Sequence, residues 1–201
     1  AKLHKILKRI FRPFKISGSE IAAAQRKAEA AREEYKMQLY LETQRILQEI
    51  EEKKLIGIVL AGRPYHADPA INHSIPDLIN QLGMAVPSED GIAMMQDSKF
   101  PPLRVLNQWT WHSRLYRSAD YVTRHADLEL VELNSFGCGL DAVVTDQVQE
   151  IMSKRNRLYP SLKIDQSMNL GAVRIRLRSL KAAIGERMQE KRSVAPILYP
   201  K

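Results

Sequence analysis

The sequence is short of cysteine, of aromatic residues and of long apolar runs. Its 201 residues contain one cysteine, Cys138, and aromatic side chains make up 6% of them. One cysteine excludes a disulfide bond within the chain, and no apolar run approaches the roughly 20 residues that a membrane-spanning helix needs. Because a secretory signal is also missing, we expect a reducing, cytoplasmic location and no transmembrane segment.

Acidic side chains are missing from the first 16 residues, and charge is uneven along the whole chain. Residues 1–54 carry a net charge of +5, residues 55–153 carry −6 and residues 154–201 carry +9. An acidic centre between basic ends does not make a single nucleic-acid-binding face, and the sequence has no aromatic-interleaved basic motif or zinc-finger spacing. We therefore expect no nucleic-acid partner.

The amino-terminal segment is basic and amphipathic. Apolar residues recur at helical spacing until Pro13, at Leu3, Ile6, Leu7, Ile10 and Phe11. This pattern fits either a segment on a membrane surface or a short helix that packs on a neighbouring domain. The following residues, to Lys54, are nearly all good helix formers and predict one long helix with Ser19 as its N-cap. Its thin, alanine-rich apolar seam indicates that it packs against another part of the protein, and we expect the α/β body, with coiled-coil pairing as the alternative.

Residues 55–90 carry the pattern that organises the rest of the chain. An apolar run, a polar loop, a helical apolar period and a second apolar run follow one another at 55–61, 63–69, 71–82 and 84–87. This order predicts a strand, a loop, a helix and a parallel strand. Ligands of such units bind at the carboxyl ends of the strands, so the loop with Arg63, Tyr65 and His66 is the predicted ligand-binding loop.

The remaining sequence repeats the alternation of strand and helix. We expect a loop at 91–102, strands at 128–133 and 158–164, and helices at 103–124, 142–152 and from 169 onward. The alternating pattern of 128–133 predicts a strand with a polar face or a place near a sheet edge. The predicted fold is α/β and Rossmann-like, with a mostly parallel sheet of about four strands flanked by helices.

This reading divides the chain into three parts. A basic segment and the long helix occupy residues 1–54, an α/β domain occupies 55–190, and a tail occupies 191–201. Further candidate ligand-binding residues are Asn72, Asn134, Asp165 and Arg174, the last of which fits a solvated helix charge equally well. His66 and His73 are candidate acid/base groups, although loop histidines with satisfied hydrogen bonds are commoner. No nucleophile paired with a base is visible.

Cys138 lies between two glycines, after the strand expected at 128–133 and before a helix. A helix amino terminus lowers the pKa of a thiol, which favours a reactive or metal-binding thiolate. The alternative is a small buried cysteine in a tight turn. As a metal ligand, Cys138 alone is insufficient for an iron–sulfur cluster, because a cluster takes about four protein ligands in the common case.

Three separated motifs carry a family resemblance: AGRPYH-DP-INH-IP, NSFGCGLDAVVTDQV and LKID-NLGAVRIRLRSL. With the lead-in FRPFKIS-EI they cover nearly the whole chain. They resemble the acyl-CoA dehydratase activase-related proteins, which are relatives of the 2-hydroxyacyl-CoA dehydratase and benzoyl-CoA reductase subunits. In that family, long polypeptides join ATPase domains to dehydratase-like domains, and ATP hydrolysis drives low-potential electron transfer through iron–sulfur clusters.

The resemblance implies a dehydratase-like portion of a CoA-substrate-specific enzyme activase that serves an acyl-CoA dehydratase or reductase. The chain has no recognisable ATPase motif, so ATP would bind to other domains of the parent polypeptide, and this portion would not be an active enzyme by itself. Of the cluster-binding cysteines of the dehydratase subunits, only Cys138 has a counterpart here, so we expect a complete cluster in the parent only. The alternative is a non-redox scaffold or binding domain for an acyl-CoA, another anionic ligand or a partner subunit.

Overall fold

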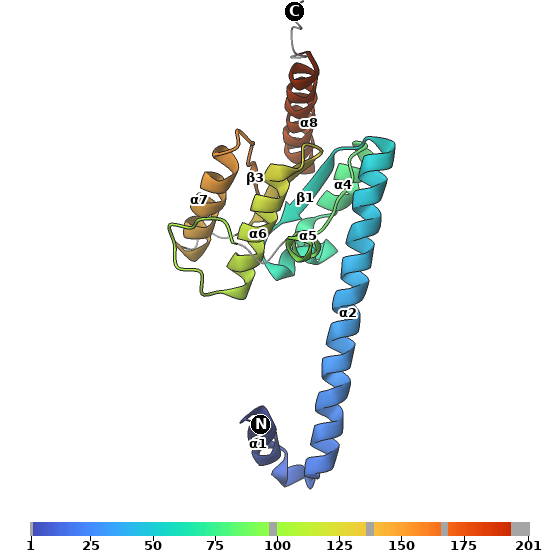
Figure 1. The fold of residues 1–201 in the computed structure, drawn as a ribbon, viewed down its shortest axis with the longest axis vertical. Coiled ribbons are helices and arrows are strands. Elements are labelled where there is room, and N and C mark those ends of the chain that lie inside the picture. The colour runs from blue at the N-terminus through green and yellow to red at the C-terminus, as the bar shows by residue number, and fades with distance from the viewer. Residues whose placement is uncertain (1, 97–99, 136–138, 166–168, 194–201) are drawn as a thin grey trace, which may run out of the picture. The chain divides into compact units, whose positions relative to one another are not determined.

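The computed structural model describes residues 2–96, 100–135, 139–165 and 169–193. The chain divides into two compact units, a helical unit (Ala1–Glu42) and an α/β unit (Thr43–Lys201). The division falls within helix α2 (Gly18–Lys53), whose last 11 residues belong to the α/β unit. Figure 1 gives the order of the elements along the chain.

The helical unit consists of α1 (Lys2–Ile10), a 3-10 turn η1 (Arg12–Phe14) and the first part of α2. Pro13 lies in this turn, which agrees with the predicted stop of the first helix. The long helix is also confirmed, but the predicted cap, Ser19, is wrong. Ser17 and Glu20 form a reciprocal capping box: Ser17 Oγ accepts the Glu20 N–H at 3.2 Å, and Glu20 Oε2 accepts the Ser17 N–H at 2.9 Å.

The apolar seam predicted for α2 is covered at its two ends. Ile21 is 5% exposed and Ile50 is fully buried, whereas Tyr35 is 60% exposed. Ile50 belongs to the core of the α/β unit. The carboxyl-terminal end of the helix therefore packs on the α/β body as predicted.

The α/β unit is built on a three-stranded parallel sheet of β1 (Gly57–Ala61), β2 (Leu128–Asn134) and β3 (Ser161–Lys163), in that order. The segment predicted as a further strand at 84–87 makes two isolated parallel bridges to β1, through Ala85 and Ser88. Pro87 has no N–H to donate, which limits this segment to bridges. The predicted α/β class with a small parallel sheet is confirmed, with three regular strands in the described residues.

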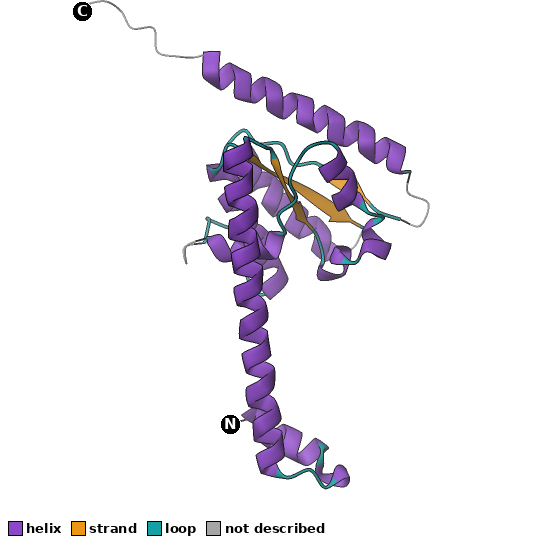
Figure 2. Ribbon diagram, turned by 90° about the vertical axis from the view of Figure 1, so that its right-hand side faces the viewer, coloured by secondary structure: helices purple, strands orange, loops and turns teal. Residues whose placement is uncertain are grey.

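Helices cover both faces of the sheet (Figure 2). One apolar cluster joins the sheet to the end of α2 and to α5 (Glu89–Met95), α6 (Thr110–Arg124) and α7 (Gly139–Ser153). The other cluster joins the sheet to α4 (Ile75–Gln81) and α8 (Leu170–Ser193). Two apolar interfaces on one sheet explain why β2 is buried along its first six residues. No helix among the described residues is long and apolar enough to cross a membrane.

Two local predictions on the first half of the α/β unit are wrong. The single helix expected at 71–82 is two helices, α3 (Pro69–Asn72) and α4, because His73 and Ser74 adopt left-handed φ values of 52° and 57°. The loop expected from Gly91 begins as helix α5. A Cβ at Gly91 would lie 2.0 Å from Thr43 Oγ1, so this glycine serves close packing and not a turn.

The second half of the α/β unit also differs in detail from the sequence prediction. Helix α6 begins at Thr110 and not at residue 103, because the preceding loop is bonded to α7 through the Arg104 N–H and Gln147 Oε1 at 2.7 Å. Strand β3 covers only three residues of the predicted 158–164. Helix α8 continues through Ser193, into the predicted tail, and residues 194–201 lie outside the described ranges.

The prediction of a polar face or an edge place for β2 is wrong, because β2 is the middle strand and its glutamates are buried. Glu129 is fully buried and lies 3.1 Å from the Arg157 guanidinium, and Arg187 of α8 contacts the same carboxylate. Arg157 also donates to the carbonyl oxygens of Val122 and Leu128 at 2.7 and 2.8 Å. This ionic cluster ties α8 and the α7–β3 connection to the sheet.

Candidate functional site

A cavity opens at the carboxyl ends of the three strands, the edge at which the sequence predicts a ligand crevice. Its volume is about 720 Å³, and its described lining residues follow all three strands or belong to the α3 region: Tyr65, Ala70, Ile71, His73, Ser135, Ile164 and Asp165. The polar groups are few and the walls are mostly aliphatic or aromatic, which is typical of a small-molecule site. We name it the strand-end cavity.

The loop after β1 is held by hydrogen bonds within its own sequence. It forms a 3-10 turn, η2 (Pro64–Ala67), in which the Arg63 N–H donates to His66 Nδ1 at 3.0 Å. Asn72 Nδ2 donates to the His66 carbonyl at 3.0 Å, so Asn72 lies behind the loop as a support. A Cβ at Gly62 would lie 2.4 Å from His66 Nδ1 and 3.0 Å from the Leu133 carbonyl, so this position requires glycine.

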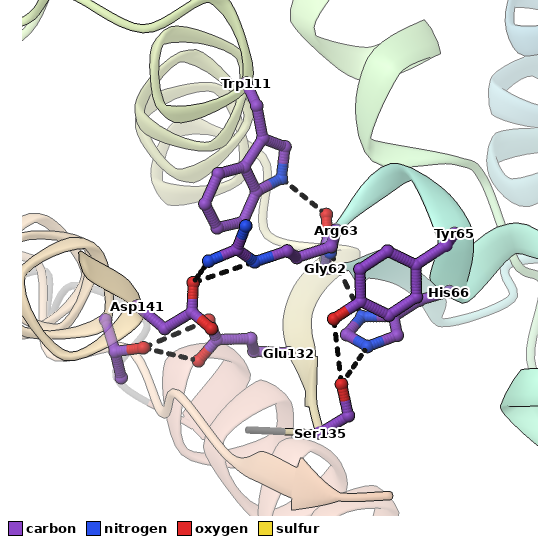
Figure 3. Close-up of polar contacts among 9 residues, drawn as sticks. Gly62, Arg63, Tyr65, His66, Trp111, Glu132, Ser135 and Asp141 are labelled. Carbon is purple, nitrogen blue, oxygen red and sulfur yellow. Dashed lines mark hydrogen bonds and ion pairs between the residues drawn. The ribbon is translucent and has the colours of Figure 1, made fainter. Parts of the chain in front are cut away.

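His66 has a defined hydrogen-bonding state. A backbone N–H donates to its Nδ1, so the neutral ring carries its hydrogen on Nε2, which donates to Ser135 Oγ at 3.0 Å (Figure 3). His66 is 4% exposed, and burial lowers its pKa. The negative charge of Asp141 opposes this shift, and the positive charge of Arg63 adds to it. The ring is therefore neutral near pH 7, and it cannot act as a base toward Ser135.

Ser135 and Tyr65 extend this arrangement into the strand-end cavity. Their hydroxyl oxygens are 3.0 Å apart, and both residues line the cavity. The Tyr65 ring also packs edge-on against His66 with centroids 4.5 Å apart, which fixes the position of its hydroxyl. The three side chains form a hydrogen-bonded chain that starts at a buried donor and ends at hydroxyls on the cavity wall (Figure 3). Such a chain suits the binding of a carbonyl or other oxygen acceptor.

The Arg63 side chain is directed to buried partners from α6 and α7. Its Nε donates to Asp141 Oδ1 at 2.9 Å, and its guanidinium lies 4.7 Å from the centre of the Trp111 ring. Trp111 Nε1 in turn donates to the Gly62 carbonyl at 2.6 Å. Asp141 is 5% exposed, so this ion pair is largely shielded from water. The contacts indicate that Arg63 fixes the loop to α6 and α7.

A second buried carboxyl, Glu132, lies beside this ion pair (Figure 3). Thr145 Oγ1 lies 3.0 Å from each of its carboxylate oxygens. Burial raises the pKa of Glu132, and the charge of Asp141 raises it further, while the hydrogen bond from Thr145 opposes the shift. His112 is also buried here, with its ring 4.7 Å from that of Trp111, and burial and the Arg63 charge lower its pKa. Glu132 and His112 thus lie close to the buried Arg63–Asp141 ion pair that holds the loop.

The remaining predicted site residues lie at different distances from the cavity. Asp165 and His73 line it. Asn134 ends β2, and its carbonyl accepts the Ile164 N–H at 2.8 Å. Arg174 lies on α8, where it donates to Gln81 Oε1 at 3.4 Å, and it is Arg176 that reaches a neighbouring recess. Cys138 lies outside the described residues.

This neighbouring basic recess has a volume of about 260 Å³ and shares Asp165 with the strand-end cavity. Its lining residues are Leu162, Lys163, Asp165, Asn169, Ala172, Val173 and Arg176. Lys163 is the last residue of β3, and Arg176 lies on α8. The recess therefore brings two cations next to one end of the cavity. The sequence prediction did not include either residue.

The chain alone does not fit a complete iron–sulfur cluster. It has a single cysteine, whereas a cluster takes about four protein ligands in the common case. Within the described ranges, no three His, Cys, Asp or Glu side chains are grouped so that they could hold a metal ion. A cluster that involves Cys138 would need its other ligands from another domain or chain.

Comparison with known proteins identifies one family. Searches of curated proteins and of solved structures find no match to the chain. Residues 1–92 match the model of the family described as "CoA enzyme activase uncharacterised domain". The matched range extends from α1 through the loop with Arg63, Tyr65 and His66, and it includes the glycine that this loop requires. This match supports a CoA enzyme activase-related domain at residues 1–92, which are slightly less than half of the chain.

Proposed function

We propose that the chain is a non-redox binding domain of a CoA enzyme activase-related protein, and that the strand-end cavity takes the acyl-pantetheine arm of an acyl-CoA. The observation that carries this proposal is the combination of two hydroxyls and one carboxylate on a largely apolar wall. An acyl-pantetheine arm has the matching chemistry: a thioester and two amides separated by methylene groups.

The polar groups of the cavity match the two sides of an amide. Ser135 and Tyr65 present hydroxyl groups to carbonyl oxygens, and His66 orients Ser135 from behind. Asp165 is an acceptor for amide N–H groups. Ile71, Ile164 and Ala70 cover the methylene groups between them, and burial of apolar surface supplies most of the affinity in such sites.

The basic recess supports the same assignment. A CoA ester carries phosphate groups at the end of the arm, and Lys163 and Arg176 lie in a recess that shares Asp165 with the cavity. Cations on a partly open surface bind phosphate through charge-assisted hydrogen bonds, so they add affinity that falls with increasing salt concentration. This arrangement extends the site from the acyl end to the phosphate end.

The partner follows from the family. A CoA enzyme activase-related domain implies a CoA-dependent enzyme as partner, and we assign an acyl-CoA dehydratase or reductase to that role. ATP would act at other domains of the parent polypeptide. The domain would then hold the acyl-CoA, or recognise its loaded state, while the chemistry takes place elsewhere.

A second candidate function is participation in low-potential electron transfer through Cys138. In the sequence, Cys138 lies between Ser135, which lines the cavity, and Gly139, which begins α7. One thiolate from Cys138, with others from the parent or a partner, would complete a shared cluster. Iron analysis of the parent with Cys138→Ser tests this function, and full iron content in the variant would end it.

Titration calorimetry with butyryl-CoA tests the binding function. We expect Ser135→Ala and Tyr65→Phe each to weaken binding about tenfold, which corresponds to about 1.4 kcal/mol for a lost hydrogen bond. Tyr35→Phe is the matched control, because Tyr35 is 60% exposed on α2 and removal of its hydroxyl should leave affinity unchanged. Butyryl-CoA that fails to bind the unaltered chain at about 1 mM would refute the proposal.

A further inference from the structure

The helical unit has many large apolar side chains and almost no core. Among residues 2–42, only Ile21 is buried. Six large apolar residues around α1 are at least 36% exposed: Leu3, Ile6, Ile10, Phe11, Phe14 and Ile16. A cluster of exposed apolar residues of this kind marks an interaction site in a soluble protein.

A groove is lined by residues of α1 and of the first turns of α2, both within the helical unit. It has a volume of about 390 Å³ and is lined by Leu7, Phe11, Ile16, Glu20, Ile21, Ala24, Gln25 and Ala28. His4 Nδ1 and Gln25 Oε1 are 2.9 Å apart and hold α1 against α2 at one side of the groove. Leu3, Ile6 and Ile10 are further exposed apolar residues of α1. We name the lining and these three residues the N-terminal groove.

The α1 side of the N-terminal groove is positively charged. Residues 1–16 contain six Lys or Arg side chains and no Asp or Glu, and α1 has no buried residue, so this side of the groove carries exposed cations. Cations around an apolar surface favour an occupant with an apolar face and acidic flanks, because opposite charges steer association and like charges oppose it.

The floor of the groove fits a helix better than a flat surface. Ala24 and Ala28 are four residues apart on α2, so they share a face and let another backbone approach closely. The walls supplied by Leu7 and Phe11 form a recess for larger side chains. A bilayer surface is flat and fluid and does not fill such a recess.

We propose that the N-terminal groove docks an acidic amphipathic helix of a partner protein. The apolar face of that helix lies on Ala24 and Ala28 with its anchors against Leu7 and Phe11, and its acidic flanks face the cations of α1 and η1. This is helix-in-groove recognition, in which anchors recur at i, i+3 or i+4, and i+7. The proposal is independent of the strand-end cavity.

Fluorescence anisotropy with two designed peptides tests the proposal on the full chain. Each peptide has about 21 residues with leucine anchors at helical spacing, and the polar positions are glutamate in one and lysine in the other. We expect the glutamate peptide to bind at least about tenfold more tightly than the lysine peptide, and its affinity to fall as salt rises from about 0.05 to 0.5 M.

Two variants with matched controls locate the binding surface. Phe11→Ser removes an anchor wall and should weaken binding of the glutamate peptide about tenfold, whereas Ile175→Ser, at a 67% exposed position on α8, should not. Lys5→Glu combined with Lys8→Glu should remove the preference for the glutamate peptide, whereas Arg155→Glu should leave it intact. The charge variants keep every apolar side chain, so they report on docking even if Phe11→Ser disturbs the unit.

Five results would overturn the proposal. They are equal affinity for both peptides, absence of glutamate-peptide binding at about 1 mM, or affinity that is unchanged in both groove variants. The fourth is tighter binding to vesicles of phosphatidylglycerol and phosphatidylcholine than to the peptide, which would assign the surface to a membrane. A native mass of two chains that the groove variants reduce to one would assign it to a second copy and would likewise overturn the proposal.

Discussion

The two units of this chain use amphipathic sequence in opposite ways. In the α/β unit, the end of α2 and the apolar faces of α4, α5, α6, α7 and α8 meet the two faces of a small sheet and form two buried clusters. In the helical unit, α1 is as clearly amphipathic, but it has no buried residue, and its apolar face remains exposed around a groove. Periodicity therefore predicts which side of a helix is apolar, and the rest of the fold decides whether that side becomes core or binding surface.

The difference extends to charged side chains. The α/β unit buries Glu129, Glu132, Asp141 and Arg157, each with a charged or hydrogen-bonding partner. The charges of the helical unit are on its surface and form pairs such as Glu33–Lys36 at 2.9 Å. Exposed pairs contribute little to stability, whereas removal of one partner from a buried pair is costly. Substitutions should thus have very different effects in the two units.

Arg157→Met should have the largest effect. It leaves Glu129 buried with Arg187 as its remaining ion-pair partner and removes donors from the Val122 and Leu128 carbonyls. We expect a loss of about 3–5 kcal/mol in the free energy of unfolding, measured by urea denaturation. Arg155→Met, two residues away and exposed, should change stability by less than about 0.5 kcal/mol. Equal effects of the two would contradict the buried role of Arg157.

A pair of isoleucine substitutions compares the units directly. Ile58 is fully buried on β1, so Ile58→Ala should cost about 2–5 kcal/mol. Ile10 is 53% exposed on α1, so Ile10→Ala should cost less than about 0.5 kcal/mol. Urea denaturation followed by circular dichroism measures both. A cost at Ile10 similar to that at Ile58 would show that the helical unit has a core in solution and would argue against an exposed groove.

The pH dependence of stability should come from the α/β unit. Burial raises the pKa of Glu89 to about 7, against the opposing charge of Arg114. A carboxyl whose pKa is higher in the folded than in the unfolded state favours folding below pH 4.5, and this contribution is lost as pH rises from 4.5 to about 7. Relative to Glu89→Gln, the unaltered protein should lose about 1–3 kcal/mol across this window. The exposed Glu29→Gln should keep the pH profile of the unaltered protein.

Two glycines give the smallest and sharpest contrast. Gly62→Ala would place a methyl group 2.4 Å from His66 Nδ1, so we expect a loss of about 1–2 kcal/mol and weaker ligand binding. Gly185 lies in α8 with nothing within 4 Å of the added methyl, so Gly185→Ala should raise stability by about 0.5–1 kcal/mol. Thermal melts measure both. Unchanged ligand binding in Gly62→Ala would show that the conformation of this loop does not contribute to the binding site.

Local patterns predicted the elements better than their contacts. The long helix, the parallel sheet and the edge that carries the cavity follow from periodicity and from the geometry of parallel strands. Helix α5 was missed because a glycine such as Gly91 usually indicates a turn. Here the glycine instead allows close packing against Thr43. The break between α3 and α4 was missed because neither His73 nor Ser74 is a glycine, and other residues adopt positive φ only rarely.

The site was predicted in part for the same reason. Tyr65, His66 and Asp165 follow predicted strands, and the structure places them together around the strand-end cavity. Ser135 lies 69 residues from His66, and Asp141 lies 78 residues from Arg63, and no local pattern links such pairs. In the sequence, Arg63 has the position expected of a ligand-binding arginine. Only the folded chain shows that its guanidinium pairs with Asp141 and packs on Trp111.

Binding of the separate parts of an acyl-CoA tests the central claim most directly. Calorimetry would compare S-butyryl-pantetheine, which lacks the nucleotide, with adenosine 3′,5′-bisphosphate, which lacks the arm, on the unaltered chain and on Ser135→Ala. We expect S-butyryl-pantetheine to bind and to lose about tenfold in affinity in the variant, because its carbonyl groups meet the Ser135 and Tyr65 hydroxyls. Adenosine 3′,5′-bisphosphate that binds while S-butyryl-pantetheine does not would contradict the assignment of the strand-end cavity.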